Sequence, residues 1–296
     1  MMRTMLAVVL VIALAMTASA FGIRTYDALY TGDTAATAEA GVFGIQGSFI
    51  YLMSDSYYDH DGESQDFDDG WKGTGMWFPI KFSYGVMDNF EIGVTPMFVM
   101  NKFESAVEEE GTGIADTWIW AKYGFMPDPI VTARLGFKVA TGVDSEDADL
   151  DELPTGDGQM DIDGALVFGV PAGPGSLDAS VGYRYRMDKT YEDDSDYTPG
   201  NEVNFTATYT YFLGDAMNLR LGAGGFFGSD PEIDGEPFDD LSGETAVGQK
   251  LVSINPGFDY IMDSGVTLGF DVYYPLMGTN VDAGWGLGLS AGWGNY

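Results

Sequence analysis

Residues 201–213 read N-E-V-N-F-T-A-T-Y-T-Y-F-L, in which apolar and polar side chains alternate. The odd positions from Val203 to Leu213 are apolar or aromatic, and the even positions from Glu202 to Thr210 are polar. Successive side chains of a β-strand point to opposite faces of the sheet, so this alternation predicts a strand with one apolar face. The run exceeds the roughly 5–6 residues usual in soluble proteins. It suits a tilted strand of about 9–11 residues that crosses a membrane.

The same alternation recurs along the chain and predicts twelve strands. It is clear in residues 177–187, where Leu177 begins an apolar face and Asp178 a polar one, and again in residues 130–141. The twelve runs lie near residues 41–54, 71–85, 90–103, 114–126, 130–142, 158–170, 177–189, 201–213, 219–228, 247–262, 266–276 and 284–295.

The connections between these runs alternate in length, which is typical of an outer-membrane barrel with short periplasmic turns and long extracellular loops. The sequence therefore predicts an all-β fold, a single antiparallel up-and-down transmembrane β-barrel of about 12 strands over residues 41–296. A soluble secreted β-sandwich is the alternative interpretation. The long, polar connections are those at 55–70, 104–113, 143–157, 190–200 and 229–246, and the last connection on that side, near 277–283, is brief.

The composition excludes several other classes of protein. The 296 residues include 13 Lys and Arg against 46 Asp and Glu, and the net charge of −33 argues against nucleic-acid binding. The absence of cysteine excludes a disulfide framework and thiolate chemistry. A single histidine, His60, leaves little basis for a Ser-His-Asp triad or a histidine metal site. The sequence therefore predicts neither an enzyme nor a bound cofactor.

The charges are sorted between the loops and the strands. Thirty of the 46 acids lie in residues 55–70, 104–110, 144–157, 188–196 and 230–244, so the excess negative charge belongs to the predicted extracellular side. The polar strand faces carry similar numbers of cations and anions, which indicates paired ions in a narrow polar lumen. These side chains either line a path for a solute or only neutralise one another and close the interior. The candidates are Lys81, Glu91, Asp116, Trp118, Trp120, Lys122, Arg134, Lys138, Asp161, Asp163, Asp178, Arg184, Arg186, Glu202, Arg220 and Asp271.

The N-terminal residues carry the pattern of an export signal. Arg3 precedes an apolar run from Met5 to Met16, and Ala18–Ala20 is an A-x-A cleavage sequence, so residues 1–20 are predicted to be a secretory signal peptide. The apolar run is too short to span a bilayer. Residues 21–40 would then precede the barrel, either as a periplasmic segment or as a small plug folded into the lumen.

Several short motifs resemble a known family. They are G-I-A-D-T-W at 113–118, A-K-Y at 121–123, G-F-K-V-A-T-G at 136–142 and L-P-T-G-D-G-Q-M-D at 153–161. Their order resembles the outer-membrane proteins named for the meta-pathway of phenol degradation. The chain departs from that pattern at Ala115 and Ala140, where the family has Gly and Pro, and Pro154 begins the P-T-G within a loop. The resemblance implies a barrel in the bacterial outer membrane that passes small, often aromatic or apolar, molecules.

Two functions fit these observations. The first is an outer-membrane channel or uptake protein, embedded in lipid, for small and aromatic or apolar solutes. The alternative is a non-transporting surface barrel whose acidic extracellular loops bind divalent cations or partners, because such cations prefer oxygen ligands. Asp230–Gly235 resembles half of a calcium loop, but Leu241 stands where the twelfth-position Glu belongs, so an EF-hand is excluded.

Overall fold

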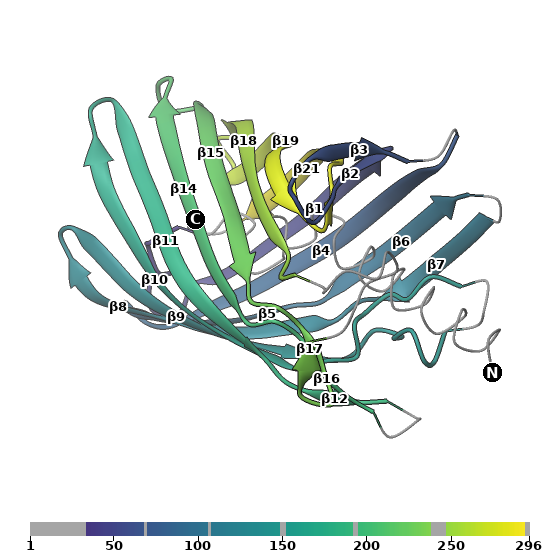
Figure 1. The fold of residues 1–296 in the computed structure, drawn as a ribbon. Coiled ribbons are helices and arrows are strands. Elements are labelled where there is room, and N and C mark those ends of the chain that lie inside the picture. Colours follow the sequence, from purple (N-terminus) through teal and green to yellow (C-terminus); the bar gives the residue numbers. More distant parts are fainter. Residues whose placement is uncertain are drawn as a thin grey trace, which may run out of the picture.

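The computed structural model describes residues 34–67, 70–105, 108–148, 152–191, 195–237 and 247–293, and the signal-peptide prediction for residues 1–20 lies outside them. These residues form a closed antiparallel β-barrel (Figure 1). β1 (Phe43–Ser54) pairs with β21 (Trp285–Trp293) on one side and with β4 (Lys72–Met87) on the other, which closes the wall. The described residues contain no helix long and apolar enough to cross a membrane.

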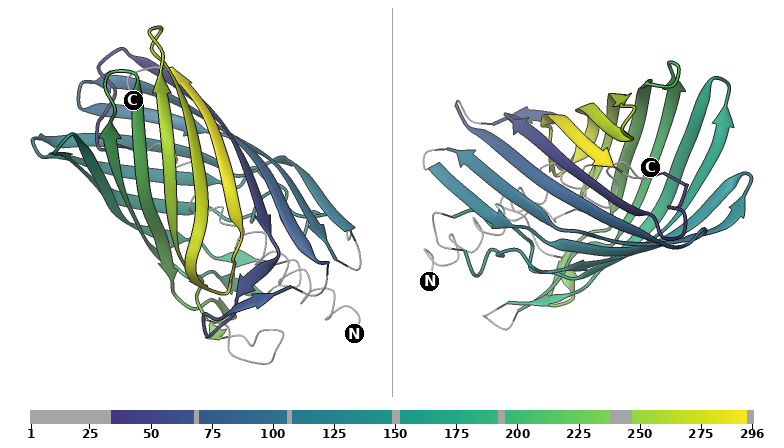
Figure 2. Two further views of the ribbon diagram at one scale, coloured as in Figure 1. Left: turned by 90° about the horizontal axis from the view of Figure 1, so that it is seen from above. Right: turned by 180° about the vertical axis from the view of Figure 1, so that it is seen from behind.

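The barrel wall has twelve strand positions, which confirms the predicted number. Each strand pairs with the strands before and after it in the chain, so the wall follows the sequence from β1 round to β21 (Figures 1 and 2). The remaining strands are β5 (Phe90–Thr95) continued by β6 (Met97–Glu104), β7 (Glu108–Ile114) continued by β8 (Thr117–Pro127), β9 (Ile130–Val139), β10 (Asp161–Ala172), β11 (Gly175–Arg186), β14 (Glu202–Phe212), β15 (Met217–Gly228), β18 (Lys250–Ile261) and β19 (Val266–Thr279).

Two predicted strands are each divided into two pieces. Pro96 separates β5 from β6, because proline has no N–H to donate to the neighbouring strand. Asp116 lies in the gap between β7 and β8. The prediction of a polar loop at 104–113 is therefore wrong, since β7 continues the wall beside β6 over most of that range. β9 ends at Val139, so β7 pairs with β6 but not with β9.

The long connections contain small sheets of their own, which the alternation pattern did not predict. β2 (Ser56–Tyr58), β3 (Ser64–Asp66) and β20 (Val281–Asp282) form one, so the brief connection near 277–283 is partly a strand. β12 (Lys189–Thr190), β13 (Asp196–Thr198), β16 (Glu232–Ile233) and β17 (Glu236–Pro237) form the other. Both small sheets lie at the end opposite the short turns (Figure 1). We refer to their end as extracellular, following the rule for such barrels.

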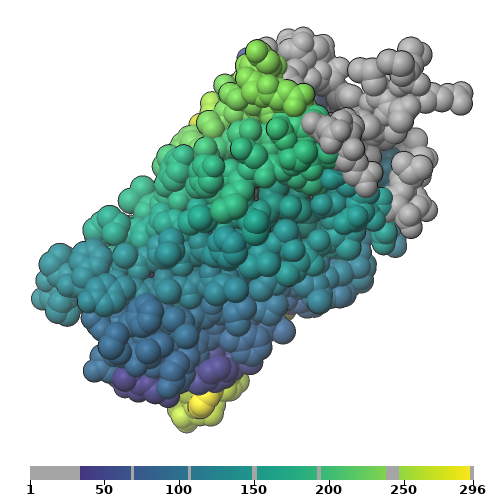
Figure 3. Space-filling view, turned by 90° about the horizontal axis from the view of Figure 1, so that it is seen from below, coloured from purple at the N-terminus to yellow at the C-terminus, as the bar shows by residue number. Residues whose placement is uncertain are grey.

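Burial alternates along the strands in the sense expected for a membrane barrel. In β10, Asp161 and Asp163 are buried inside, whereas Leu166 and Phe168 are exposed on the outer wall. An apolar exterior is stable because lipid, not water, contacts it. Figure 3 shows this wall as bands of colour in chain order. The last described strand, β21, ends at Trp293, whose side chain shares the outer face with Leu289.

Candidate functional site

The sixteen side chains predicted to line the lumen all lie on the inner side of the wall or at its openings. Thirteen are buried, and fourteen of the sixteen fall into three groups along the barrel. The other two contact each other, since Lys81 Nζ lies 4.9 Å from the centroid of the Trp120 ring. The buried ones are Lys81, Glu91, Asp116, Trp118, Trp120, Lys122, Arg134, Lys138, Asp161, Asp163, Arg184, Arg186 and Glu202, and the half-buried ones are Asp178, Arg220 and Asp271.

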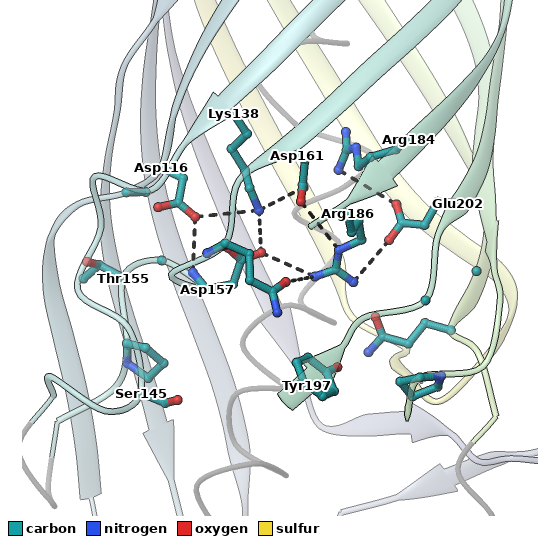
Figure 4. Close-up of a pocket in the computed structure, with 18 of the residues that line it drawn as sticks. Asp116, Lys138, Ser145, Thr155, Asp157, Asp161, Arg184, Arg186, Tyr197 and Glu202 are labelled. Atoms are coloured by element: carbon teal, nitrogen blue, oxygen red, sulfur yellow. Dashed lines mark hydrogen bonds and ion pairs between the residues drawn. The ribbon is translucent and has the colours of Figure 1, made fainter. Parts of the chain in front are cut away.

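The largest group is a network of ion pairs in the extracellular half. Lys138 Nζ lies 2.9 Å from Asp161 and 3.9 Å from Asp116. Arg186 lies 3.5 Å from Glu202 through Nη1 and donates a 3.1 Å hydrogen bond to Gln159 through Nη2. Figure 4 shows these side chains converging from neighbouring strands. Each cation contacts several acceptors, so their charges are compensated inside the protein.

A second part of this network lies one layer deeper. Asp163 lies 3.3 Å from Arg134 and 3.7 Å from Arg184, and it accepts a 2.9 Å hydrogen bond from Asn204. Arg184 also stacks over Trp118, with its guanidinium carbon 4.8 Å from the ring centroid. The strand register explains these contacts, because Asp163 pairs directly with Arg184 between β10 and β11.

Asp157 belongs to the same network but was not among the predicted residues. It contacts both Lys138 and Arg186. Burial alone would raise the pKa of Asp157, but the positive charges of Lys138 and Arg186 outweigh burial and hold that pKa below its usual range. The sequence placed Asp157 in an acidic loop, where a solvated side chain is the ordinary expectation.

Asp116 connects that loop to the barrel wall. Its Oδ1 accepts hydrogen bonds from the backbone of Thr141 at 3.2 Å and Gly142 at 3.1 Å, and its Oδ2 accepts one from Asp157 at 3.2 Å. The close approach requires glycine, because a Cβ on Gly156 would lie 2.5 Å from Asp116 Oδ1. Three of the motifs that carry the family resemblance, at 113–118, 136–142 and 153–161, are therefore in contact with one another.

A cavity of about 140 Å³ lies beside this network. Its lining combines the charged side chains with apolar ones from β6 and from the loops. Figure 4 shows Arg186, Asp157 and Tyr197 around it. The lining includes Met97, Val99, Ala115, Asp116, Trp118, Lys138, Asp157, Asp161, Arg184, Arg186, Tyr191, Tyr197 and Glu202.

The other side of the lumen is apolar at this level, so the expectation of a polar interior is wrong for that side. The buried apolar cluster draws inward-facing residues from six wall strands, with Ala115 beside β7 and Val281 of β20 completing it. β21 leaves room for them, because a Cβ on Gly286 would lie 2.4 Å from Leu52. The cluster contains Ile50, Leu52, Trp77, Met97, Val99, Ala115, Phe226, Leu251, Tyr273 and Val281.

The second group surrounds the chain segment that precedes β1. Lys122 Nζ donates to the backbone oxygens of Thr34 at 2.6 Å and Ala36 at 2.8 Å. Asp178 accepts a 2.9 Å hydrogen bond from the Ala35 amide, and Ala35 is completely buried. On the same segment, the Ala38 amide donates to Glu91 at 3.2 Å. Residues 34–38 thus contact inward-facing side chains of β5, β8 and β11 in the periplasmic half.

The third group is a triad near the short turns. Arg220 lies 2.8 Å from Asp259 and 3.0 Å from Asp271, and all three side chains are half-buried. Glycine again provides the space, because a Cβ on Gly257 would lie 2.4 Å from Asp271. Asp259 was not among the sixteen candidates.

The acidic loops do not assemble into a metal site within the described part of the chain. No group of three or more His, Cys, Asp or Glu side chains there has a geometry that would hold a metal ion. His60 Nε2 lies 3.3 Å from a carboxylate oxygen of its neighbour Asp61. The hypothesis of divalent cations at the loops therefore gains no support from these residues.

Comparisons with known proteins agree with this architecture. The family model described as "Putative MetA-pathway of phenol degradation" matches residues 79–291. An outer membrane channel from Pseudomonas putida F1 is 15% identical, with a TM-score of 0.71, and the match covers 88% of this chain and 97% of that one. The translocator domain of the autotransporter NalP from Neisseria meningitidis is 13% identical, with a TM-score of 0.53, over 92% and 94% of the two chains. No curated protein matches the sequence.

Proposed function

Because the chain belongs to the family described by that phenol-degradation model, we propose that it is a channel for small aromatic or apolar molecules. The molecule is a β-barrel of the bacterial outer membrane. The family's description supplies the solute class, since phenol is a small aromatic molecule with one polar group. We propose that solutes of this class pass through the lumen of this barrel.

The observation that carries the proposal is the two-sided lining of the extracellular half of the lumen. Val99 and Ala115 belong to the apolar cluster and also line the cavity, whereas Lys138 and Arg186 line its other side. An apolar wall removes an aromatic ring from water at a gain of about 25 cal/mol per Å². The compensated ion network offers hydrogen-bonding groups to a hydroxyl without exposing a net charge.

The segment before β1 supplies the second element of the proposal. Residues 34–38 contact inward-facing side chains in the periplasmic half, which supports a small plug formed by this described part of the 21–40 segment. A plugged lumen passes small apolar solutes better than hydrated ions, because an ion must shed water to pass a constriction. We therefore expect low ionic conductance together with measurable permeation of phenol.

The test compares two properties of the refolded chain. Single-channel conductance in a planar bilayer measures ion passage, and phenol influx into proteoliposomes, normalised to protein-free vesicles, measures solute passage. Phenol influx above the vesicle background, with glucose influx at background, is the expected result.

Trp77→Ala, which removes the largest fully buried side chain of the apolar cluster, should alter phenol influx. Tyr274→Leu on the outer wall is the matched control. Equal influx of phenol with and without the folded protein would contradict the proposal.

A further inference from the structure

Four aromatic side chains form a contiguous group at the extracellular end, outside the cavity described above. Tyr57 of β2 stacks on Phe67, with ring centroids 5.7 Å apart. Phe67 meets Phe103 of β6 edge-on at 5.8 Å, and Trp71 meets the same ring edge-on at 6.1 Å. The group joins the connection after β1 to the projecting end of β6, and Figure 1 shows these elements at one end of the barrel. We call these four residues the aromatic group.

The aromatic group is not sealed from solvent. Tyr57 is 38% exposed and Trp71 is 36% exposed, although both carry large aromatic rings. Neither side chain lies on the lipid-facing band of a long wall strand, because Tyr57 belongs to a loop sheet and Trp71 precedes β4. Large exposed aromatic surfaces at such a position are typical of binding sites.

A carboxylate accompanies the aromatic group. Glu109 of β7 is paired in register with Phe103 of β6, and directly opposite residues of antiparallel strands point to the same face. Its Oε2 is buried, and the side chain has no hydrogen-bond or ion-pair partner among the described residues. A carboxylate held next to a ring without a cation favours a positively charged ligand.

The neighbouring lysine is engaged elsewhere. Lys102 lies on the opposite face of β6 and contacts Glu104, Glu108 and Glu110. Glu109 lies between Glu108 and Glu110 in the chain, but its side chain points to the opposite face of the strand. Lys102 therefore does not neutralise its charge. The net charge of −33 further concentrates cations at the extracellular surface.

We propose that Tyr57, Phe67, Trp71, Phe103 and Glu109 form a binding site for a small organic cation of the quaternary or alkylated ammonium class. Aromatic faces attract such cations through the ring quadrupole, and an adjacent carboxylate adds a direct charge interaction. A neutral aromatic solute would use the rings but not Glu109, and an anion would be repelled. The site is independent of the channel proposal, because it lies outside the cavity and requires no transport.

The experiment titrates the refolded full-length mature protein in non-ionic detergent, since choline headgroups of zwitterionic detergents would compete. The ligands are choline and 3,3-dimethylbutan-1-ol, which has the same shape without the charge, and phenol is a third ligand. Isothermal titration calorimetry gives the dissociation constants. The variants are Glu109→Gln and Trp71→Leu, and their controls are Glu110→Gln on the other face and Tyr274→Leu on the outer wall.

We expect choline to bind at least roughly tenfold more tightly than its neutral analogue, as a cation–aromatic contact strengthened by a carboxylate requires. Glu109→Gln and Trp71→Leu should each weaken choline binding by about fivefold or more, and the controls should leave it unchanged. Slower migration in unboiled gels verifies that each variant is folded. Equal affinity for choline and its neutral analogue, or choline binding unaffected by Glu109→Gln, would overturn the proposal. Failure of choline to bind the folded parent protein would do the same, and the rings would then only fasten the loop to β6.

Discussion

Asp163 on β10 and Arg134 on β9 form an ion pair at 3.3 Å in which both side chains are almost completely excluded from solvent. Asp163 also contacts Arg184 and Asn204, so its buried carboxylate is shared among several donors. Removal of one partner from such a pair leaves the other charge buried and uncompensated.

Replacing Asp163 should therefore destabilise the barrel strongly. Asp163→Ala leaves two buried arginines without their shared anion, and breaking a buried pair costs about 3–5 kcal/mol. Urea-induced unfolding of the refolded protein, followed by tryptophan fluorescence, measures the change. Glu104→Gln, in a solvent-exposed pair with Lys72, is the matched control and should have little effect. Equal midpoints for the two variants would show that the network is not stabilised by this carboxylate.

The contact between the 143–160 connection and Asp116 should depend on Gly156. In Gly156→Ala the new Cβ would lie 2.5 Å from Asp116 Oδ1 and 2.9 Å from Gly142, so one of the partners must move. Overpacking of this kind costs about 1–3 kcal/mol. We expect faster cleavage of this connection by proteinase K. Gly164→Ala is the control, because its Cβ would meet nothing within 4 Å. Unchanged cleavage of the Gly156→Ala variant would contradict the prediction.

Lys122 should control ion passage through the periplasmic half. Its ammonium donates to two backbone oxygens of the segment before β1, so Lys122→Ala removes the side chain that fastens Thr34 and Ala36. We expect larger or more frequent single-channel openings, by roughly twofold or more, because a hydrogen bond to a charged group contributes about 1.5–3 kcal/mol. Lys72→Ala at the extracellular rim should leave the openings unchanged. Identical recordings for the two variants would mean that the segment stays in place without Lys122.

The small sheet that contains β20 should weaken as the pH rises. Burial raises the pKa of Asp282 to about 8 from an ordinary 3.8, and its Oδ2 has no partner among the described residues. Between these two values the unfolded segment releases a proton that the folded one retains, so the stability is greatest below pH 4 and falls as the pH approaches 8.

Asp282→Asn removes this dependence, because the amide carries no charge. At pH 7 the variant should show slower hydrogen exchange than the parent in peptides spanning 56–58 and 281–283, by a stabilisation on the order of a few kcal/mol. Near pH 4 the two should exchange alike. Asp263→Asn, in an exposed turn, is the control. Faster exchange of Asp282→Asn at pH 7 would reverse the assigned sign.

The number and order of the wall strands could be predicted from the sequence because lipid and lumen impose a strict alternation. Asp163 is an odd-numbered and Leu166 an even-numbered residue of β10, and this difference alone places their side chains on opposite faces of the strand. The predicted loop at 104–113 failed because Glu108, Glu109 and Glu110 resemble a solvated acidic run. Cross-strand pairing with Lys102 and Phe103 makes that run a strand, and such pairing is not visible in the local composition.

The candidate site was predictable in part for the same reason. Buried charges such as Lys138 stand out on a strand, whereas Asp157 lies in a loop and joins the network only through tertiary contacts. The apolar cluster was missed because inward-facing Ile50 and Leu52 alternate with outward-facing aromatic residues such as Tyr51. Both faces of β1 are therefore apolar at its extracellular end, so polar and apolar side chains do not alternate there.

The pairing of β1 with β21 sets a constraint on how the molecule is made. Ile45 pairs with Trp293, so the seam joins residues separated by nearly the whole chain. Contacts between such distant residues form slowly, because a long loop must close before they contribute any stability. No exported chain of this protein can close its wall until its last strand has emerged. Until β21 is in place, the unpaired edge of β1 is open to pairing with other chains.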